Sequence, residues 1–364
     1  MNIGFVTTYS AQHPAGLERC TLDLLRAVLS SDRGNRYSVY TKKGSGLGEM
    51  LSEYRNVRVV EIGFGKFWKD IGLFFAPRAD VYVFNGPQVP LFFAPRRYAV
   101  VAYDFGYHAF FAPGVRSYLK RKFLDALARL AFRRSQHILA ISQHTKDEIV
   151  RLFSTDESKI HVMHLGFADI ATLPREPVAG IAEKFFLFVG TLKERKNPLN
   201  IIRAFAAFHK THPDYHLVLA GKPSSETAYR EAMASVIEQE RLEAQVKFLG
   251  RVSDRELAWL YGNAAALVYP SFIEGFGFPI LEAASAGTPV ITSNVSSLPE
   301  IAGDAALLVD PASPDAIAGA LKRVADDPSL RHNLIQKGKG RLNQFSWGKT
   351  AQQFTGVLKT YNLG

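Results

Sequence analysis

Short apolar runs, rich in β-branched and aromatic residues, alternate with helical patterns along the chain. In the first half these runs are NIGFVTT, RYSVYT, VRVVEI, DVYVFN, YAVVAYD, HILAIS and IHVMHLG. Helical periodicity separates several of them, at about residues 17–30 and 117–134. Continuous apolar strands that alternate with helices are typical of parallel sheets covered on both faces. The first half therefore predicts a doubly wound α/β domain.

The same alternation starts again after ADIATLPREPVAG, a segment with the composition of a linker. The apolar runs that follow are KFFLFVGT, HLVLAG, VKFLGR, ALVYPS, PVITS and ALLVD. Helices are expected between them near 198–211, 225–241, 254–263, 279–286, 297–302 and 314–326. We expect two Rossmann-like domains facing a cleft, residues 1–172 and 173–345, followed by a terminal segment, 346–364. Ligands of such sheets bind beyond the carboxyl ends of the strands.

Length and composition agree with two globular domains. The chain has 364 residues, of which 47% are hydrophobic and 21% charged, so each half can bury a core. Cys20 is the single cysteine, which excludes an intramolecular disulfide and fits a reducing compartment. MNIGFVTTYS is typical of a first strand rather than of a signal peptide, and no apolar run approaches the ~18 residues of a membrane span. We therefore expect a cytoplasmic protein.

The net charge of +10 is concentrated in the first half of the chain. Residues 1–172 carry 23 Lys and Arg against 15 Asp and Glu, a balance of +8, which leaves +2 for the rest. The densest segment, 116–135, has seven basic side chains and one acid, Asp125, with apolar residues at helical spacing. Such a basic amphipathic helix either exposes a solvated charged face or docks on an anionic lipid surface, here the inner face of the membrane. Nucleic-acid binding is not expected, because nothing resembles a stacking or groove-reading module.

The stretch ALVYPSFIEGFGFPILE combines a strand end, a glycine-bearing loop and a helix start. The loop runs from Glu274 to Gly277, and Pro279 suits the first position of a helix. Such a loop presents backbone amides and a favourable dipole to an anion, and Gly275 lets the backbone approach it closely, so phosphate is the expected guest. Glu282, in the first helical turn, can accept hydrogen bonds from ribose hydroxyls. Alternatively, the two glutamates are an ordinary loop charge and an ordinary first-turn acid.

A second candidate site follows the first strand of this domain, in LFVGTLKERKNPLNIIRAF. Arg195 and Lys196 precede a helix that starts near Pro198, so two cations and a helix N-terminus converge where a diphosphate can bind. Two adjacent loop cations can equally be solvated. The sequence has no His or Cys ligand spacing and no Asp-x-Asp near a strand end. No metal is therefore expected, and the cations would stabilise the diphosphate themselves.

These segments resemble the signature of GT-B glycosyltransferases of family 4, the group 1 glycosyl transferases. The two glutamates of that signature are separated by seven residues, as Glu274 and Glu282 are, and AGTPVITSNVSSLPEIAGDAALLVDPASPDAIAGAL continues the match. The resemblance implies donor-binding roles for Glu274 (sugar), Glu282 (ribose) and the backbone of Gly275, Phe276 and Gly277 (phosphate).

The resemblance also covers the other loops of the second domain. The family places a lysine at the position of Lys196, whereas Thr191 stands where many members have an arginine directly after the glycine. Either Arg195 replaces that arginine, or the phosphate is held less tightly. The backbone near Arg251 and Val252 is expected to contact the nucleotide base.

In the first half the sequence departs from the family pattern at two places. YSAQHPAGLERC resembles the glycine-rich loop of the family, with Ala15 and Gly16 where two glycines are common. Gly16 either approaches the donor phosphate or serves as a turn residue. In VVAYDFGYHAF, Tyr103 and Asp104 stand where relatives often have His-Asp, and a histidine follows at His108. Either Asp104 or His108 then orients the sugar at the reaction centre, or the geometry differs.

The resemblance implies a retaining, metal-independent hexosyltransferase without a cofactor. Its donor would be a nucleoside-diphosphate sugar, with mannose favoured, and its acceptor a glycan or a lipid-linked molecule in bacterial cell-surface polysaccharide assembly. Residues 346–364 would form a helix that crosses back to the N-terminal domain, with Trp347 as a packing anchor. Two alternatives stay open: a nucleotide-sugar epimerase of the same architecture, and a non-catalytic protein that binds nucleotides or polyanions. The base, the linkage and the oligomeric state do not follow from the sequence.

Overall fold

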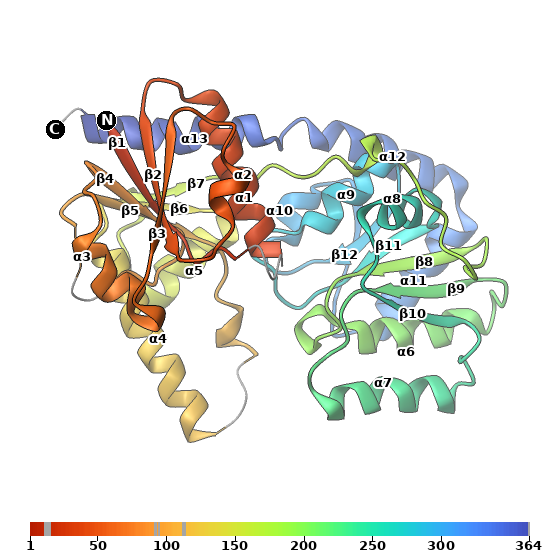
Figure 1. Ribbon diagram of the computed structural model, residues 1–364. Coiled ribbons are helices and arrows are strands. Elements are labelled where there is room, and N and C mark those ends of the chain that lie inside the picture. Colours follow the sequence, from red (N-terminus) through yellow and green to blue (C-terminus); the bar gives the residue numbers. More distant parts are fainter. Residues whose placement is uncertain (11–15, 91–92, 94, 111–113, 363–364) are drawn as a thin grey trace. The chain divides into compact units, whose positions relative to one another are not determined.

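The chain folds into two compact units in the computed structural model (Figure 1). The structure describes residues 1–10, 16–90, 93, 95–110 and 114–362. The first unit comprises Met1–Gly166 and Phe345–Gly364, and the second comprises Phe167–Gln344. Each unit contains one parallel sheet with its own buried core, as the two series of apolar runs predict.

All seven strands expected in the first unit are present in one sheet, in the order β3-β2-β1-β4-β5-β6-β7. They are β1 (Asn2–Val6), β2 (Arg36–Lys42), β3 (Val57–Ile62), β4 (Val81–Phe84), β5 (Tyr98–Ala102), β6 (His137–Ala140) and β7 (Ile160–Val162). Strand β1 pairs in parallel with β2 and β4, with Ile3 opposite Tyr37 and Val81. The strand order reverses beside β1, so the loops after β1 and β4 lie at a topological switch point.

Helices flank this sheet (Figure 1). They are α1 (Gly16–Ser31), α2 (Leu47–Met50), η1 (Gly65–Phe67), η2 (Trp68–Gly72), α3 (Leu73–Phe75), η3 (Gly106–His108), α4 (Val115–Arg134), α5 (Gln143–Phe153), η4 (Glu157–Lys159), α13 (Trp347–Lys359) and η7 (Thr360–Asn362). Here η denotes a 3-10 helix, except that η2 is a π-helical turn. Ser142 caps α5 by accepting a hydrogen bond from the Thr145 amide at 3.1 Å, which a serine at a strand end favours.

Helix α4 confirms the helix expected at about 117–134, but only half of its apolar stripe is packed. Ala128, Ala131 and Phe132, near its C-terminus, are buried. Leu119 and Phe123 are 60% and 59% exposed, and this N-terminal half projects away from the sheet (Figure 1). In the described part of the chain no helix is both long enough and apolar enough to cross a membrane.

The C-terminal helix α13 packs on α1 within the first unit. Thr350 anchors it, because its hydroxyl donates a hydrogen bond to the His164 carbonyl at 2.9 Å. A Cβ at Gly166 would lie 2.5 Å from Cγ of Trp347, so only glycine fits at this contact. Trp347 therefore packs closely against the chain segment that leaves β7.

The six strands expected in the second unit also form one parallel sheet, in the order β10-β9-β8-β11-β12-β13. They are β8 (Phe185–Val189), β9 (His216–Ala220), β10 (Val246–Gly250), β11 (Ala266–Tyr269), β12 (Val290–Ser293) and β13 (Ala306–Val309). The helices are η5 (Ile170–Thr172), η6 (Glu194–Lys196), α6 (Pro198–His209), α7 (Thr227–Gln239), α8 (Asp254–Asn263), α9 (Phe278–Ala286), α10 (Leu298–Ala302), α11 (Pro314–Asp326) and α12 (Pro328–Leu342). Helix α12 was not predicted, because it buries little beyond Leu334 and Gly338 and so lacks a strong apolar period.

The boundary between the units lies between Gly166 and Phe167, whereas the sequence placed it after residue 172. The intervening turn η5 packs on α8 and α9 of the second unit. Just beyond it, the Glu176 amide donates a hydrogen bond to the Arg255 carbonyl at 3.2 Å. Packing, rather than linker composition, decides where this segment belongs.

Candidate active site

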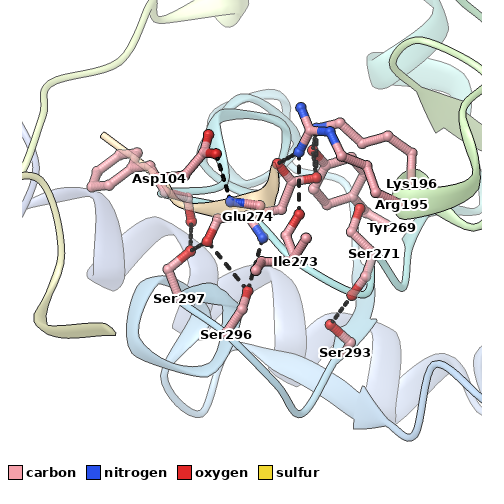
Figure 2. A network of polar contacts seen from close by, with 12 residues as sticks. Asp104, Arg195, Lys196, Tyr269, Ser271, Ile273, Glu274, Ser293, Ser296 and Ser297 are labelled. Atoms are coloured by element: carbon pink, nitrogen blue, oxygen red, sulfur yellow. Dashed lines mark hydrogen bonds and ion pairs between the residues drawn. The ribbon is translucent and has the colours of Figure 1, made fainter. Parts of the chain in front are cut away.

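Glu274 lies in the loop between β11 and α9 and is the most buried acidic side chain of the site, at 6% exposure. Lys196 Nζ donates a hydrogen bond to its Oε1 at 2.5 Å, and Arg195 Nη1 lies 3.4 Å from its Oε2. The Tyr269 hydroxyl donates to Oε1 at 2.7 Å (Figure 2). The structure therefore brings together Glu274, Arg195 and Lys196, three residues that the sequence placed at the ends of two strands.

Burial and charge act in opposite directions on this carboxylate. Burial by itself would raise the pKa of Glu274, but the positive charges of Lys196 and Arg195 and the hydrogen bonds from Lys196 and Tyr269 outweigh it, so the pKa lies below the ordinary 4.5. Burial and the neighbouring carboxylate raise the pKa of Tyr269 well above 10. The site thus holds an ionised glutamate and a neutral phenol at neutral pH.

Tyr269 links the lysine to the glutamate. Its hydroxyl accepts a hydrogen bond from Lys196 Nζ at 2.6 Å while donating to Glu274. Lys196 Nζ also lies 5.1 Å from the centre of the Tyr269 ring, within cation–π range. The sequence analysis missed this residue, since a tyrosine at the end of an apolar strand has the pattern of an ordinary core residue.

The glycine-aromatic loop is fixed by serines of the next loop. Ser297 Oγ lies within hydrogen-bonding distance of the carbonyl oxygens of Glu274, at 2.9 Å, and Phe276, at 2.7 Å (Figure 2). Ser296 Oγ accepts a hydrogen bond from the Glu274 amide at 3.0 Å. Gly277 has φ 125°, and a Cβ there would lie 2.9 Å from Leu298, so this position requires glycine. Gly275 is buried in the same loop.

Glu282 lies one residue further into its helix than predicted. Helix α9 begins at Phe278, so Glu282 is its fifth residue and lies outside the first turn. The prediction assumed that the helix starts at Pro279, but proline here takes the second helical position. The Glu282 carboxylate accepts a hydrogen bond from the buried hydroxyl of Tyr261 at 2.9 Å. Each glutamate of the motif is therefore held by a different buried tyrosine.

Asn197 is a further residue that the sequence analysis missed. It adopts a left-handed conformation, φ 66°, between η6 and α6 and is 2% exposed. Its side-chain amide donates to the carbonyls of Pro270, at 3.0 Å, and Pro311, at 2.7 Å. It ties together the loops after β8, β11 and β13. Its signal in the sequence is an asparagine directly before Pro198 at a helix start.

The remaining residues predicted in this unit lie in loops after strands. Thr191, after β8, is half-buried, and its carbonyl accepts a hydrogen bond from the Lys193 amide at 2.8 Å. Arg251 and Val252 follow β10, and Arg251 is exposed. Gly250, before them, has φ 67°, which turns the chain toward α8. Strands β8 and β10 both pair with β9, so these loops lie on the same edge of one sheet.

In the first unit, Asp104 and His108 lie in the loop after β5. Asp104 is exposed, and its Oδ1 accepts a hydrogen bond from the Gly106 amide at 3.1 Å. His108 Nε2 lies 2.9 Å from Oδ1 of Asp125 in α4, the same oxygen to which the Tyr107 hydroxyl donates. His108 therefore has a local partner, whereas the Asp104 carboxylate reaches solvent.

Tyr103 stands where relatives often have histidine. It takes part in a polar network with Asn85 and Thr21. Its hydroxyl donates to Asn85 Oδ1 at 2.5 Å, and Asn85 Nδ2 donates to Thr21 Oγ1 at 2.8 Å. Burial raises the pKa of Tyr103 well above 10. Gly16 is the exposed first residue of α1, and Ala15 with the rest of 11–15 lies outside the described residues.

Two family comparisons match consecutive parts of this chain. Glycosyltransferase Family 4 matches residues 14–168, and Glycosyl transferases group 1 matches residues 169–341. The chain belongs to this glycosyltransferase family. The boundary between the two matches coincides with the boundary between the structural units to within two residues.

Two relatives of this glycosyltransferase are named as O-antigen chain mannosyltransferases. O-antigen chain mannosyltransferase B of Escherichia coli is 31% identical over 289 residues, which span 76% of this chain and 74% of that protein. O-antigen chain mannosyltransferase RfbU of Salmonella typhimurium is 30% identical over 213 residues, which span 58% of this chain and 57% of that protein.

Solved glycosyltransferase structures share the fold along nearly the whole chain. A crystal structure of Anabaena HepE in complex with UDP and glucose has a TM-score of 0.78 and 20% identity, and the match covers 99% of this chain and 100% of that one. WaaG, a glycosyltransferase involved in lipopolysaccharide biosynthesis, has a TM-score of 0.74 and 16% identity, over 98% of this chain and 99% of that one. The glycosyltransferase thus has the GT-B fold that its motifs predict.

The described part of this glycosyltransferase contains no group of three or more His, Cys, Asp or Glu side chains placed to hold a metal ion. The ion pairs of Glu274 with Arg195 and Lys196 lie at the carboxyl edge of the second sheet.

Proposed function

We propose that this glycosyltransferase transfers a hexose from a nucleoside-diphosphate sugar to an acceptor hydroxyl, with retention of configuration and without a metal ion. The observation that carries the proposal is the pairing of the buried Glu274 and Tyr269 with the partly exposed Arg195 and Lys196, beside a glycine loop and the start of α9. The two cations provide the positive charge that a departing diphosphate needs.

The donor is proposed to lie along the carboxyl edge of the second sheet. The backbone of Gly275, Phe276 and Gly277 would bind phosphate near the N-terminus of α9. Glu274 would contact the sugar and Glu282 the ribose hydroxyls. Thr191 would lie beside the diphosphate, and the backbone of Arg251 and Val252 would contact the base. The loops that carry these residues follow β8 and β10, which both pair with β9.

The reaction is proposed to occur on one face of the sugar. The bond between the acceptor oxygen and the anomeric carbon forms as the bond from that carbon to the diphosphate oxygen breaks, and both events take place on the same face. The acceptor proton passes to the leaving diphosphate oxygen, so configuration is retained. Arg195 and Lys196 hold the charge that develops on that oxygen.

In the first unit we assign the contact with the reacting sugar to Asp104 rather than to His108. Asp104 is exposed, whereas the His108 ring lies beside Asp125 of α4. Gly16, at the start of α1, is proposed to approach the donor phosphate, because its missing side chain leaves the N-terminus of a 16-residue helix open to a ligand.

A mannose-like donor and a glycan or lipid-linked acceptor fit the names of the two O-antigen mannosyltransferases to which the chain is similar. The N-terminal half of α4 supports a membrane-borne acceptor. Within 115–123, Val115, Tyr118, Leu119 and Phe123 are exposed next to four basic side chains, and no acidic residue is present. We therefore propose that α4 docks on an anionic membrane surface.

The first test is the thermal stability of the purified protein with UDP, GDP or ADP, each in the presence of EDTA. A nucleotide at about a hundred times its dissociation constant should stabilise the fold by about 2.7 kcal/mol. Lys196→Ala should abolish the shift, whereas Lys193→Ala, an exposed lysine of the same loop, should keep it. No shift with any nucleotide, or an equal shift in Lys196→Ala, would contradict the proposed diphosphate site.

A second test separates transfer from epimerisation. Radiolabelled nucleotide sugar is incubated with and without a membrane extract that contains acceptors, and the products are separated. Transfer moves label into the glycan or lipid fraction only when the acceptor is present. A change of the free donor sugar without an acceptor would identify an epimerase instead, and donor binding without any product would identify a binding protein.

A further inference from the structure

Five exposed apolar side chains gather in the short helical segment between β3 and β4. They are Phe64, Phe67, Ile71, Phe74 and Phe75, here called the aromatic cluster, and Phe75 is 77% exposed. With the four on α4 they make up nine of the thirteen large apolar side chains that are exposed in the described part of the chain. Such a concentration on one unit marks a contact surface.

The segment 64–75, which carries the aromatic cluster, is firmly packed on the first unit. Trp68 and Leu73, which lie between the exposed residues, are buried in the core of the first unit. A Cβ at Gly72 would lie 2.2 Å from Ile62, so the turn packs directly against β3. Trp68 and Leu73 therefore anchor the segment, and the five side chains of the aromatic cluster remain exposed.

The backbone of this segment also adopts unusual conformations. Phe64 has φ 67°, a conformation that large side chains rarely adopt, and a π-helical turn follows at Trp68–Gly72. The Phe64 ring stacks on that of Phe75 with centroids 5.9 Å apart and planes 13° from parallel. A strained residue whose ring remains exposed is better explained by function than by stability.

We propose that the aromatic cluster is a second membrane contact of the first unit, which enters the interface of an anionic bilayer in addition to α4. This inference rests on the membrane part of the proposed function. The segment 64–78 carries Lys66, Lys69 and Arg78 against a single acid, Asp70, and the surrounding half of the chain has a balance of +8. Aromatic rings flanked by cations suit the headgroup region of anionic lipids.

The test is flotation of the full chain with vesicles of phosphatidylcholine alone or mixed with phosphatidylglycerol. The variant Phe64→Ser/Phe67→Ser/Phe75→Ser should reduce partition onto the mixed vesicles about tenfold or more, because each ring contributes buried apolar area. The control Phe248→Ser/Leu308→Ser removes two exposed apolar side chains of the second unit and should bind like the parent. Undiminished flotation of the triple variant would overturn the proposal.

Three further readouts keep the outcomes distinct. The nucleotide-induced thermal shift should be equal in the parent, the triple variant and the control, so failure of the donor site and failure of the membrane contact are separable. Phe75→Trp alone should show a blue-shifted emission with phosphatidylglycerol vesicles and quenching by brominated lipid, and an unchanged spectrum on bound vesicles would contradict insertion. If sedimentation instead shows a dimer that the serine substitutions dissociate, the aromatic cluster is a contact between copies of this chain and the membrane proposal is wrong.

Discussion

The two units of this glycosyltransferase have the same kind of parallel sheet but differ in which side chains they bury and which they expose. The second unit buries a carboxylate, Glu274, against two cations at the carboxyl edge of its sheet. The first unit exposes ten of the thirteen large apolar side chains that lie at the described surface, and residues 1–172 hold +8 of the +10 net charge. The parallel-sheet scaffold thus sets where the loops lie, while the residues in the loops decide between ligand binding and surface contact.

The largest effect should follow from removal of the buried carboxylate. Glu274→Ala leaves Lys196 close to Tyr269 without its anion, which should cost about 3–5 kcal/mol of unfolding free energy. Transfer should fall at least about a hundredfold, because the variant loses a charged contact to the donor. Urea unfolding and initial transfer rates measure the two effects.

Asp214→Ala is the matched control for this comparison, because it breaks the pair of Lys184 and Asp214, which lie 2.6 Å apart on the surface. Both side chains are more than half exposed, so the loss of unfolding free energy should be much smaller than for Glu274→Ala, and transfer should not change. Equal losses in the two variants would mean that burial does not distinguish the Glu274 site.

The two tyrosines should separate the roles of the two glutamates. Tyr269→Phe removes the donor to Glu274, costs about 1–3 kcal/mol, and should lower kcat, because that glutamate faces the reacting sugar in our proposal. Tyr261→Phe removes the donor to Glu282 and should mainly raise KM for the donor. Steady-state kinetics with varied donor concentration provide the test, and identical changes in both variants would refute separate roles.

Acid should weaken the second unit through the same carboxylate. The pKa of Glu274 in the folded protein lies below the ordinary 4.5, so its stabilising contribution is fully present above pH 4.5 and is lost as the pH falls through the folded-state pKa. The pKa of Tyr269 lies well above 10, so its contribution is present below pH 10 and is lost at higher pH. Unfolding in urea across this range should show a shallower acid limb for Glu274→Gln than for the parent, and an unchanged limb would contradict the assignment.

The smallest effect on stability should come from the exposed cations of α4. Lys120→Glu/Arg121→Glu/Lys122→Glu should change the free energy of unfolding by about 1 kcal/mol or less, since Arg121 and Lys122 contact only the exposed ring of Tyr118 among the cation–π pairs of the described residues, at 5.6 Å and 5.5 Å. Binding to anionic vesicles should fall and lose its dependence on salt. Lys322→Glu/Arg323→Glu in α11 of the second unit is the control, and equal loss of binding there would mean that only net charge matters.

The spacing of the apolar residues in the sequence was sufficient to predict most of the strands and helices. Each of the thirteen expected strands is present. Strands that are buried on both faces consist of continuous apolar residues, so they can be recognised in the sequence without knowledge of the packing. The segment 64–75 was not predicted, since it has neither a strand nor a helix period and its shape depends on Trp68 and Gly72 packing against β3. The start of α9 was misplaced by one residue, because both Phe278 and Pro279 suit a first turn.

For the candidate site, the sequence placed Arg195, Lys196 and Glu274 after strands whose carboxyl ends share one edge of a parallel sheet. The pairing of β8 with β11 then brings these residues together. Three features of the site became visible only in the folded chain: Tyr269 and Tyr261 each hold one glutamate, Asn197 ties three loops together, and His108 pairs with Asp125. These contacts join residues from different elements at angstrom precision. The sequence contains the periodicity of each helix and strand, whereas side-chain contacts depend on how the helices and strands pack against one another.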